Sequence, residues 1–421
     1  MLKSLFKKFK KTIVFKTIQK TIPYRALRKV YRACRKQIRR MYRYEMLRKH
    51  YPKLYNKYAA RPVNEKKVVF IEVRESKISD SFSLMYKKVQ EEHKYEIHTH
   101  FLRSGFSKRK DYQHACEAMI TDIADAKYIF LNESSDVIAA LPMRKETIVT
   151  QLWHGCGAFK KFGMSTAELI FGDDRKTLEK YPYHGNYTYV TVSSPEVVWA
   201  YEEAMSLQDK KGVVVPTGIS RSDIFYDEEA KKAAQEKLLS VVAQAKGKKV
   251  ILYAPTFRGR VAKAKTPNQL DIAAFGDALG KDYILLFKLH PFVKKRTAIP
   301  EGYEDFAFDL TDDMSIEELL FVADICISDY SSLVFEYSLF EKPMIFFAFD
   351  LDNYYDWRGF YYDYKDFVPG PIHTTTEEMI EYIQHVDERF DKKKVQEFRQ
   401  KFMSACDGHA TERIMKMMFG E

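Results

Sequence analysis

Short apolar runs alternate with helical segments along most of this chain, and that alternation constrains the fold more than any other feature. Residues 68–73 and 250–254, for example, are rich in Val, Ile, Leu and Phe and indicate buried strands, whereas residues 79–92 indicate a helix. Strands that alternate with helices form a doubly wound parallel sheet. Because 421 residues exceed one ordinary domain, we predict two α/β domains, residues 63–212 and 213–385.

The predicted strands can be assigned along the chain from their apolar pattern. They are residues 68–73, 95–102, 128–131, 147–152 and 188–192 in the first domain, and residues 213–215, 250–254, 283–289, 325–328 and 344–349 in the second. Most of them end in a polar or reactive cluster. Since the carboxyl ends of parallel strands share one edge of a sheet, we expect these clusters to gather there.

The stretch Gln151–Gly163, QLWHGCGAFKKFG, follows the strand at residues 147–152. It offers an imidazole, His154, between a tryptophan and Gly155, and a second glycine, Gly157, that lets the backbone approach a ligand. Lys160 and Lys161 can meet phosphate, but a solvated helix start explains them equally well. Taken alone, the stretch also fits an ordinary turn between a strand and a helix.

The strand-end clusters of the second domain suit a nucleotide diphosphate ester. Ser331 and Ser332 stand at a predicted helix start, where hydroxyls, backbone amides and the helix dipole favour phosphate. Charge-assisted donors are offered by Arg221, Arg258 and Lys288. Glu336 follows Ser332 by one helical turn and can accept ribose hydroxyls. Each cluster also has a plain structural explanation, such as helix capping for the serine pair or a surface carboxylate for Glu336.

Residues 1–62 form a strongly basic arm. Of the 69 Lys and Arg and the 58 Asp and Glu, 18 basic residues and one acid, Glu45, fall within the first 50 positions, so the rest of the chain carries a slight excess of acid. Apolar residues recur there at helical spacing on both sides of Pro23. They are Leu2, Leu5, Phe6, Phe9 and Ile13, and then Leu27, Val30, Tyr31, Cys34 and Ile38.

Three interpretations of the arm compete: it binds an anionic membrane surface, it binds a nucleic acid, or it is a solvated tail without a target. The apolar stripe favours lipid, so we expect residues 1–60 to meet a membrane and no nucleic acid. No apolar run is long enough to predict a transmembrane helix, and no secretory signal is evident.

The five cysteines are scattered, which predicts free thiols in a reducing compartment and no zinc site. They are Cys34, Cys116, Cys156, Cys326 and Cys406. For Cys156 we expect a small buried turn residue and not a nucleophile. The acid pairs Asp173-Asp174 and Asp312-Asp313 are interpreted as loop or capping residues, and no metal is expected.

At these residues the chain resembles a known family, the CDP-glycerol glycerophosphotransferases that build teichoic acids in Gram-positive cell walls. The matching segments are QLWHGCGAFKKFG, PTGISRSDIF, ILYAPTFRG, LFKLHPF, ADICISDYSSLVFEYSLFEKPMIFF and RGFYYDY, within residues 147–365. The resemblance implies two Rossmann-like domains in a GT-B-like pair, with the active site in the cleft between them. Residues 386–421 would form helices that brace the two halves.

The resemblance also implies the site residues. The family's essential histidines correspond to His154 and His290. Its other ligand-contacting positions map onto Trp153, Gly155, Cys156, Gly157, Arg221, Pro255, Thr256, Lys288, Leu289, Ser331, Ser332 and Glu336.

The implied donor is CDP-glycerol or CDP-ribitol, the implied acceptor is undecaprenyl-linked, and no cofactor is expected. Known members lie peripherally on the cytoplasmic face of the cell membrane. Polymerase members often carry a longer N-terminal region, so addition of one unit and addition of many both stay open.

The expected reaction is attack of an acceptor hydroxyl on the β-phosphorus of the donor, with release of CMP. His154 is the candidate general base, and His290, with Lys288 and Arg221, would stabilise the diphosphate; the reverse assignment of the two histidines stays open. Two other classes compete, a GT-B glycosyltransferase that uses a nucleotide sugar and a non-enzymatic membrane-associated binding protein.

Overall fold

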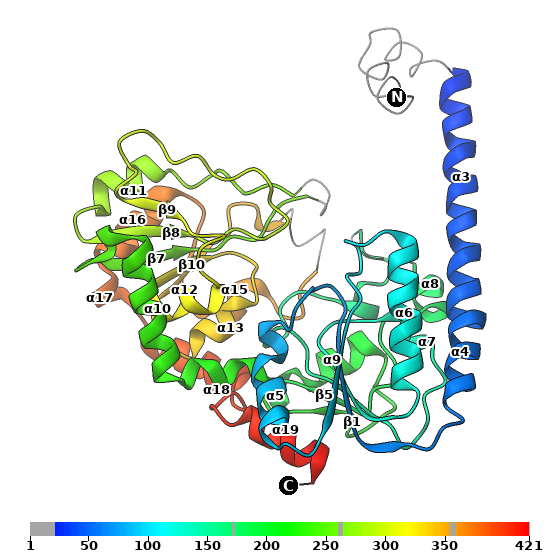
Figure 1. Cartoon of the computed structure of the whole chain (residues 1–421). Helices are drawn as coiled ribbons and strands as arrows, with labels where there is room; N and C mark the ends of the chain where they lie inside the picture. The colour runs from blue at the N-terminus through cyan, green and yellow to red at the C-terminus, as the bar shows by residue number, and fades with distance from the viewer. Residues whose placement is uncertain are drawn as a thin grey trace.

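The computed structural model describes residues 22–170, 172, 174–259, 264–352, 354 and 359–420. Two parallel β-sheets, each of six strands, form the centres of two α/β domains that lie side by side (Figure 1). The apolar stripe predicted at Leu2–Ile13 lies outside the described residues. The described part of the chain therefore has the two-domain α/β architecture that the alternating pattern predicts.

The first sheet has the strand order β2-β1-β3-β4-β5-β6, and all its neighbouring strands are parallel. Its strands are β1 (Asn64–Glu72), β2 (Glu96–Phe101), β3 (Ala126–Leu131), β4 (Ile148–Gln151), β5 (Tyr189–Thr191) and β6 (Val214–Val215). The main helices around it are α5 (Asp80–Glu91), α6 (Arg109–Ile123), α7 (Asp136–Ala140) and α9 (Val198–Met205). Residues Lys67–Glu72 of β1 are all buried, as expected for a strand covered on both faces.

The second sheet has the order β12-β11-β10-β7-β8-β9 and is also parallel throughout. Its strands are β7 (Lys249–Tyr253), β8 (Tyr283–Phe287), β9 (Ala307–Asp309), β10 (Ile325–Ser328), β11 (Met344–Phe347) and β12 (Ile372–His373). The helices are α10 (Glu228–Val241), α11 (Ile272–Leu279), α12 (Ile316–Val322), α13 (Leu333–Ser338), α15 (Tyr364–Phe367), α16 (Thr376–Gln384) and α17 (Val386–Arg389).

All ten predicted strands are present, but one was assigned to the wrong sheet. Val213–Val215 was placed in the second domain, whereas β6 pairs with β5 at the edge of the first sheet. A run of three valines shows that a strand forms but not which sheet it joins. The short edge strands β9 and β12 were missed because two or three residues give no pattern. The expected helix after Gln151–Gly163 is a 3₁₀ turn, η2 (Gly163–Thr166).

The C-terminal segment returns to both domains. Helix α18 (Lys392–Phe402) contacts α13 of the second domain and the turn η3 (Pro195–Val197) of the first. Helix α19 (Ala410–Phe419) lies against α5 and the turn η4 (Ser220–Tyr226), beneath the first domain in Figure 1. The side chain of Ile414 is fully buried in a cluster with Phe70 of β1.

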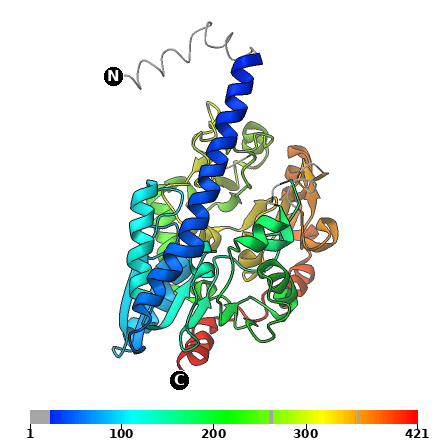
Figure 2. The same cartoon turned by 90° about the vertical axis from the view of Figure 1, so that its right-hand side faces the viewer.

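The basic arm continues as one long helix, α3 (Ile22–Glu45), followed by the π-helical turn η1 (Met46–His50) and helix α4 (Tyr51–Tyr58). The C-terminal end of α3 is tied to the first domain, where Tyr42 donates a hydrogen bond to Gln113 at 2.9 Å and Arg43 pairs with Asp136 at 3.2 Å. The N-terminal part of α3 extends beyond both domains at the top of the two views (Figure 1 and Figure 2). Among the described residues, no helix has the length and apolar character needed to span a membrane.

Candidate active site

The loop after β4 carries the predicted imidazole in a constrained backbone. Trp153 has a φ of 61°, a left-handed conformation that is rare for a bulky residue and is typical of functional turns. The buried side chain of Gln151 holds this turn, because it accepts a hydrogen bond from the Trp153 amide at 3.0 Å and donates one to the Glu133 carbonyl at 3.0 Å. The turn therefore fixes the direction in which the next residue, His154, leaves the sheet.

His154 is held through one ring nitrogen, and its side chain is partly exposed. Its Nδ1 lies 3.0 Å from the Asn132 carbonyl oxygen at the end of β3, and 44% of its side chain is exposed. A carbonyl can only accept a hydrogen bond, so Nδ1 carries the proton and Nε2 is the basic nitrogen. An exposed imidazole in this tautomer can take a proton from a substrate.

The glycines of the loop allow it to touch the second domain. A Cβ atom on Gly155 would lie 3.6 Å from Ser332 Oγ, and one on Gly157 would lie 2.2 Å from the Phe335 ring of α13. Gly157 also has a φ of +64°, which side chains rarely adopt. Its amide donates to Ser193 Oγ at 2.9 Å. The loop can therefore approach α13 only because position 157 has no side chain.

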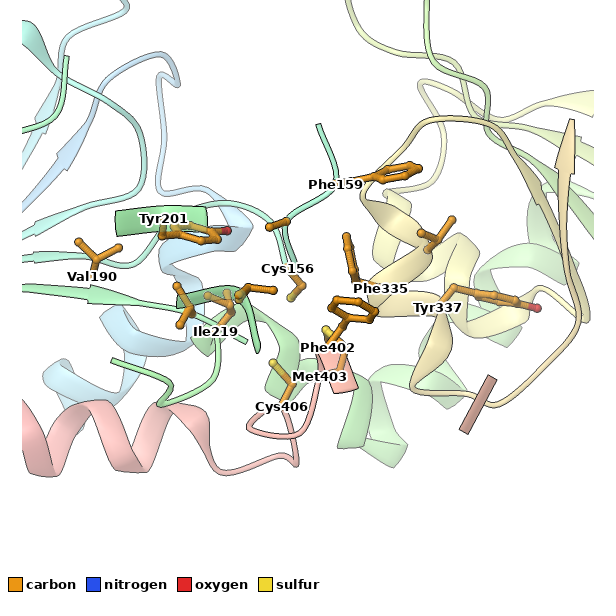
Figure 3. Close-up of a cluster of buried hydrophobic side chains, with 14 of the residues drawn as sticks. Cys156, Phe159, Val190, Tyr201, Ile219, Phe335, Tyr337, Phe402, Met403 and Cys406 are labelled. Atoms are coloured by element: carbon orange, nitrogen blue, oxygen red, sulfur yellow. The ribbon is translucent and has the colours of Figure 1, made fainter. Parts of the chain in front are cut away.

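Cys156 lies beneath the loop in the buried cluster that joins the domains (Figure 3). Hydrogen bonding to Cys406 and burial raise the pKa of its thiol well above the usual value. A thiol that resists ionisation is a poor nucleophile, which confirms the expectation of a buried turn residue. All five cysteines are free, as predicted.

The following residues extend the contact between the domains. The Lys161 amide donates to the Gly359 carbonyl at 3.1 Å, and the Tyr361 amide donates to the Phe159 carbonyl at 3.1 Å. Phe159 stacks against Phe360 with ring centroids 5.3 Å apart. Residues 159–161 thus pair with residues 359–361, so the loop is bound to the second domain at both of its ends.

Arg221, which sequence analysis assigned to the donor, connects the loop to the second domain. Its guanidinium donates to the His154 carbonyl at 2.7 Å and pairs with Glu317 at the start of α12. Glu336 is also buried nearby, and burial raises the pKa of its carboxyl group although the charge of Arg221 opposes this. The carboxyl group of Glu336 therefore lies close to the thiol of Cys156 in the loop, and its contact with ribose hydroxyls stays a prediction.

Arg258 and Lys288, which are also predicted to bind phosphate, contact carboxylates and carbonyl groups of the protein. Arg258 pairs with Asp350 at 2.6 Å and with Asp329 at 2.9 Å, and Lys288 donates to the Thr311 carbonyl at 2.9 Å and to the Met314 carbonyl. Both cations therefore lie at the carboxyl edge of the second sheet, and their contact with phosphate stays a prediction.

The other residues predicted to contact the donor in the second domain lie at the same edge of the second sheet. Pro255 and Leu289 are buried, the Thr256 amide donates to Asp329 at 2.8 Å, and the Leu289 amide donates to Thr311 at 2.9 Å. Ser331 and Ser332 precede α13 and are half-buried, and the Ser332 side chain makes no capping hydrogen bond. The Thr256 hydroxyl is buried without a hydrogen-bond partner among the described residues, and the ligand contacts predicted for this edge stay predictions.

His290 follows β8 and lies against the rings of Phe257 and Phe292, at centroid distances of 4.9 and 4.5 Å. Burial, with smaller contributions from the charges of Lys160 and Arg74, lowers the pKa of His290 to about 4. Since both charges belong to the first domain, His290 lies within electrostatic reach of that domain. Its imidazole is neutral at pH 7 in the absence of a ligand.

Several residues of this region were missed by the sequence analysis. They are Asn132, Glu133, Glu317, Asp329 and Asp350. Asn132 and Glu133 follow β3 just as His154 follows β4, so the rule that strand ends carry the site could have found them.

The acid pairs are capping or surface residues where they are described. Asp174 caps helix α8 (Arg175–Lys180), and Asp312 pairs with Arg296, whereas Asp173 lies outside the described residues. Within the described part of the chain, no group of three or more His, Cys, Asp and Glu could hold a metal ion.

Comparison with known proteins gives the family. The family model of CDP-Glycerol:Poly(glycerophosphate) glycerophosphotransferase matches residues 54–420. The teichoic acid ribitol-phosphate primase of Bacillus spizizenii is 36% identical over 359 residues, which are 84% of this chain and 90% of that protein. The teichoic acid poly(ribitol-phosphate) polymerase of the same organism is 37% identical over 363 residues, 86% of this chain but 57% of that protein.

A solved structure shares the fold. The wall teichoic acid polymerase TagF has a TM-score of 0.70 and 23% identity, covering 92% of this chain and 97% of that one. The chain belongs to the CDP-glycerol:poly(glycerophosphate) glycerophosphotransferase family.

The lowered pKa of His290 predicts the pH range in which its ring takes up a proton. In NMR spectra of the ligand-free protein, we expect its ring to stay neutral until the pH falls towards about 4, with the signal assigned by its loss in His290→Gln. Because the folded pKa lies below the unfolded value of 6.5, the unfolded chain binds more protons between these values. The free energy of unfolding should therefore fall as the pH falls through this window, and less so in His290→Gln. A midpoint near 6.5 would contradict the burial described here.

Proposed function

We propose that the protein transfers a polyol phosphate from a CDP-activated donor to a hydroxyl group of a lipid-linked acceptor and releases CMP. The observation that carries this is that the loop with His154, whose Nε2 is the basic nitrogen, lies against a serine-bearing helix start of the other domain, in a member of this family. Ribitol is the favoured polyol, because both relatives described above carry ribitol phosphate in their names.

The proposed reaction is one in-line displacement at phosphorus. The acceptor hydroxyl gives its proton to Nε2 of His154, its oxygen attacks the β-phosphorus, and the bond from that phosphorus to the oxygen of CMP breaks. The hydroxyls of Ser331 and Ser332 and the ring of His290 would contact the diphosphate. A diphosphate beside His290 would raise the pKa of its imidazole, so the neutral ring could become an additional cation on binding.

The exposed residues of helix α3 support the proposal that the protein docks at an anionic membrane surface. Every residue from Lys29 to Met41 is exposed, including Val30, Ile38 and Met41 at 59%, 60% and 62%. These apolar residues share one side of a helix that is otherwise rich in Arg and Lys, the pattern of helices that lie in the lipid headgroup region. A lipid-linked acceptor would be presented at the cytoplasmic face of the membrane, so docking there would bring enzyme and acceptor together.

Release of CMP tests the reaction. With Gram-positive membrane vesicles as the source of acceptor, we expect CMP from CDP-ribitol, a slower or absent reaction with CDP-glycerol, and no nucleotide release from UDP-sugars. His154→Ala should lower kcat by about 10²–10⁴-fold, the usual contribution of a general base. His385→Ala, an exposed histidine far along the chain, is the matched control. Release from a UDP-sugar alone would replace this proposal with a glycosyltransferase, and no release from any donor would reject it.

Sedimentation with vesicles tests the docking of α3. Val30→Ser combined with Ile38→Ser and Met41→Ser should abolish binding to phosphatidylglycerol-containing vesicles, and high salt should weaken binding of the unmodified protein. Substitution is preferable to deletion of the arm, because Tyr51 and Tyr55 of α4 are buried in the core.

The matched control for docking is Leu239→Ser with Val241→Ser, which removes exposed apolar side chains from α10. Binding that survives the triple substitution would count against α3 as the docking element.

A further inference from the structure

A carboxylate lies beside the proposed base and is not part of any prediction made from the sequence. Glu133 Oε1 is 3.8 Å from His154 Nδ1, and Glu133 Oε2 is 3.5 Å from Arg74 Nε. The Glu133 side chain is 21% exposed, against 48% for Arg74 and 44% for His154. The carboxylate thus lies between a surface arginine and the imidazole.

The nitrogen that faces Glu133 is the one that keeps its proton. Nδ1 donates to the Asn132 carbonyl, so Nε2 is left to accept a proton from a substrate. When that happens, a positive charge forms on the ring. At 3.8 Å the Glu133 carboxylate is too far for a hydrogen bond but close enough to stabilise that charge.

Hydrogen bonds fix the backbone next to both Glu133 and His154. Asn132 is buried, and its side chain donates to Glu72 at 2.9 Å and to Ser79 at 2.9 Å. Gln151 ties the carbonyl of Glu133 to the amide of Trp153, the residue before His154. The ends of β1, β3 and β4 therefore hold the carboxylate and the imidazole at a set spacing, with Arg74 holding the far oxygen of Glu133.

We propose that Glu133 is the positioning residue of the reaction, which together with Arg74 orients His154 and stabilises the imidazolium that forms as the acceptor hydroxyl loses its proton. The proton moves from the hydroxyl to Nε2, and Glu133 remains a carboxylate throughout. This inference rests on the proposed role of His154 as general base.

The test is Glu133→Gln in the full chain, with the CDP-polyol that the unmodified protein turns over. The substitution keeps the shape of the side chain and removes its charge. We expect kcat to fall by about 10- to 100-fold, less than for loss of the base itself, with the KM for the donor nearly unchanged. Glu133→Asp keeps the negative charge but places it farther from His154. Its kcat should therefore lie between those of Glu133→Gln and the unmodified protein.

A double variant separates this role from a structural one. If Glu133 acts through His154, then adding Glu133→Gln to His154→Ala should lower kcat no further than His154→Ala alone. The control is Glu146→Gln, since Glu146 also lies near an arginine, Arg144, at 4.0 Å but on an exposed part of the domain.

The outcomes distinguish the two proposals. An unmodified protein that releases no CMP rejects the proposed function, and a fully active His154→Ala rejects the base. The positioning role is wrong if His154→Ala is inactive while Glu133→Gln keeps its full kcat. It is also wrong if the loss of kcat in the double variant equals the product of the losses in the two single variants.

Discussion

The contact between Gly157 and the Phe335 ring is the constraint on which the rest of the site depends. A glycine at this position lets a loop of the first domain lie directly on α13 of the second, because any Cβ would lie 2.2 Å from the ring. The same loop carries His154, and α13 begins just after Ser332. Close packing of Gly157 against Phe335 therefore brings the loop that carries the imidazole against the helix start that carries the serines.

The buried surroundings make that contact rigid. Phe335 stacks on Phe398 of α18, so the C-terminal segment supports α13 from behind. On the other side, Arg221 binds the carbonyl of His154 and the carboxylate of Glu317. Core interiors transmit small displacements because they are packed as densely as organic crystals. The position of His154 is thus set by hydrophobic packing and an ion pair between the domains.

The sequence predicts the fold well because buried parallel strands are continuous apolar runs, and the two sheets follow from them. It also identifies the histidines and serines at strand ends. It fails where the partner of a residue is distant in the chain. The ion pair of Arg258 with Asp350, 92 positions later, is not evident from the strand-end pattern that predicts Arg258 as a phosphate ligand. The helical spacing of Glu336 does not show that its side chain is buried. The strand-end rule could have found Glu133, but the sequence alone does not show that its carboxylate lies beside His154.

Replacing Gly157 by Ala tests most directly whether this contact organises the site. Gly212→Ala is the matched control, since Gly212 also has a positive φ, of +81°, but no atom lies within 4 Å of a Cβ placed there. Both variants should lose about 1–2 kcal/mol of stability from backbone strain, but only Gly157→Ala should also lose most of its CMP release, because its methyl group forces the loop away from α13. Equal activity of the two variants would contradict the account.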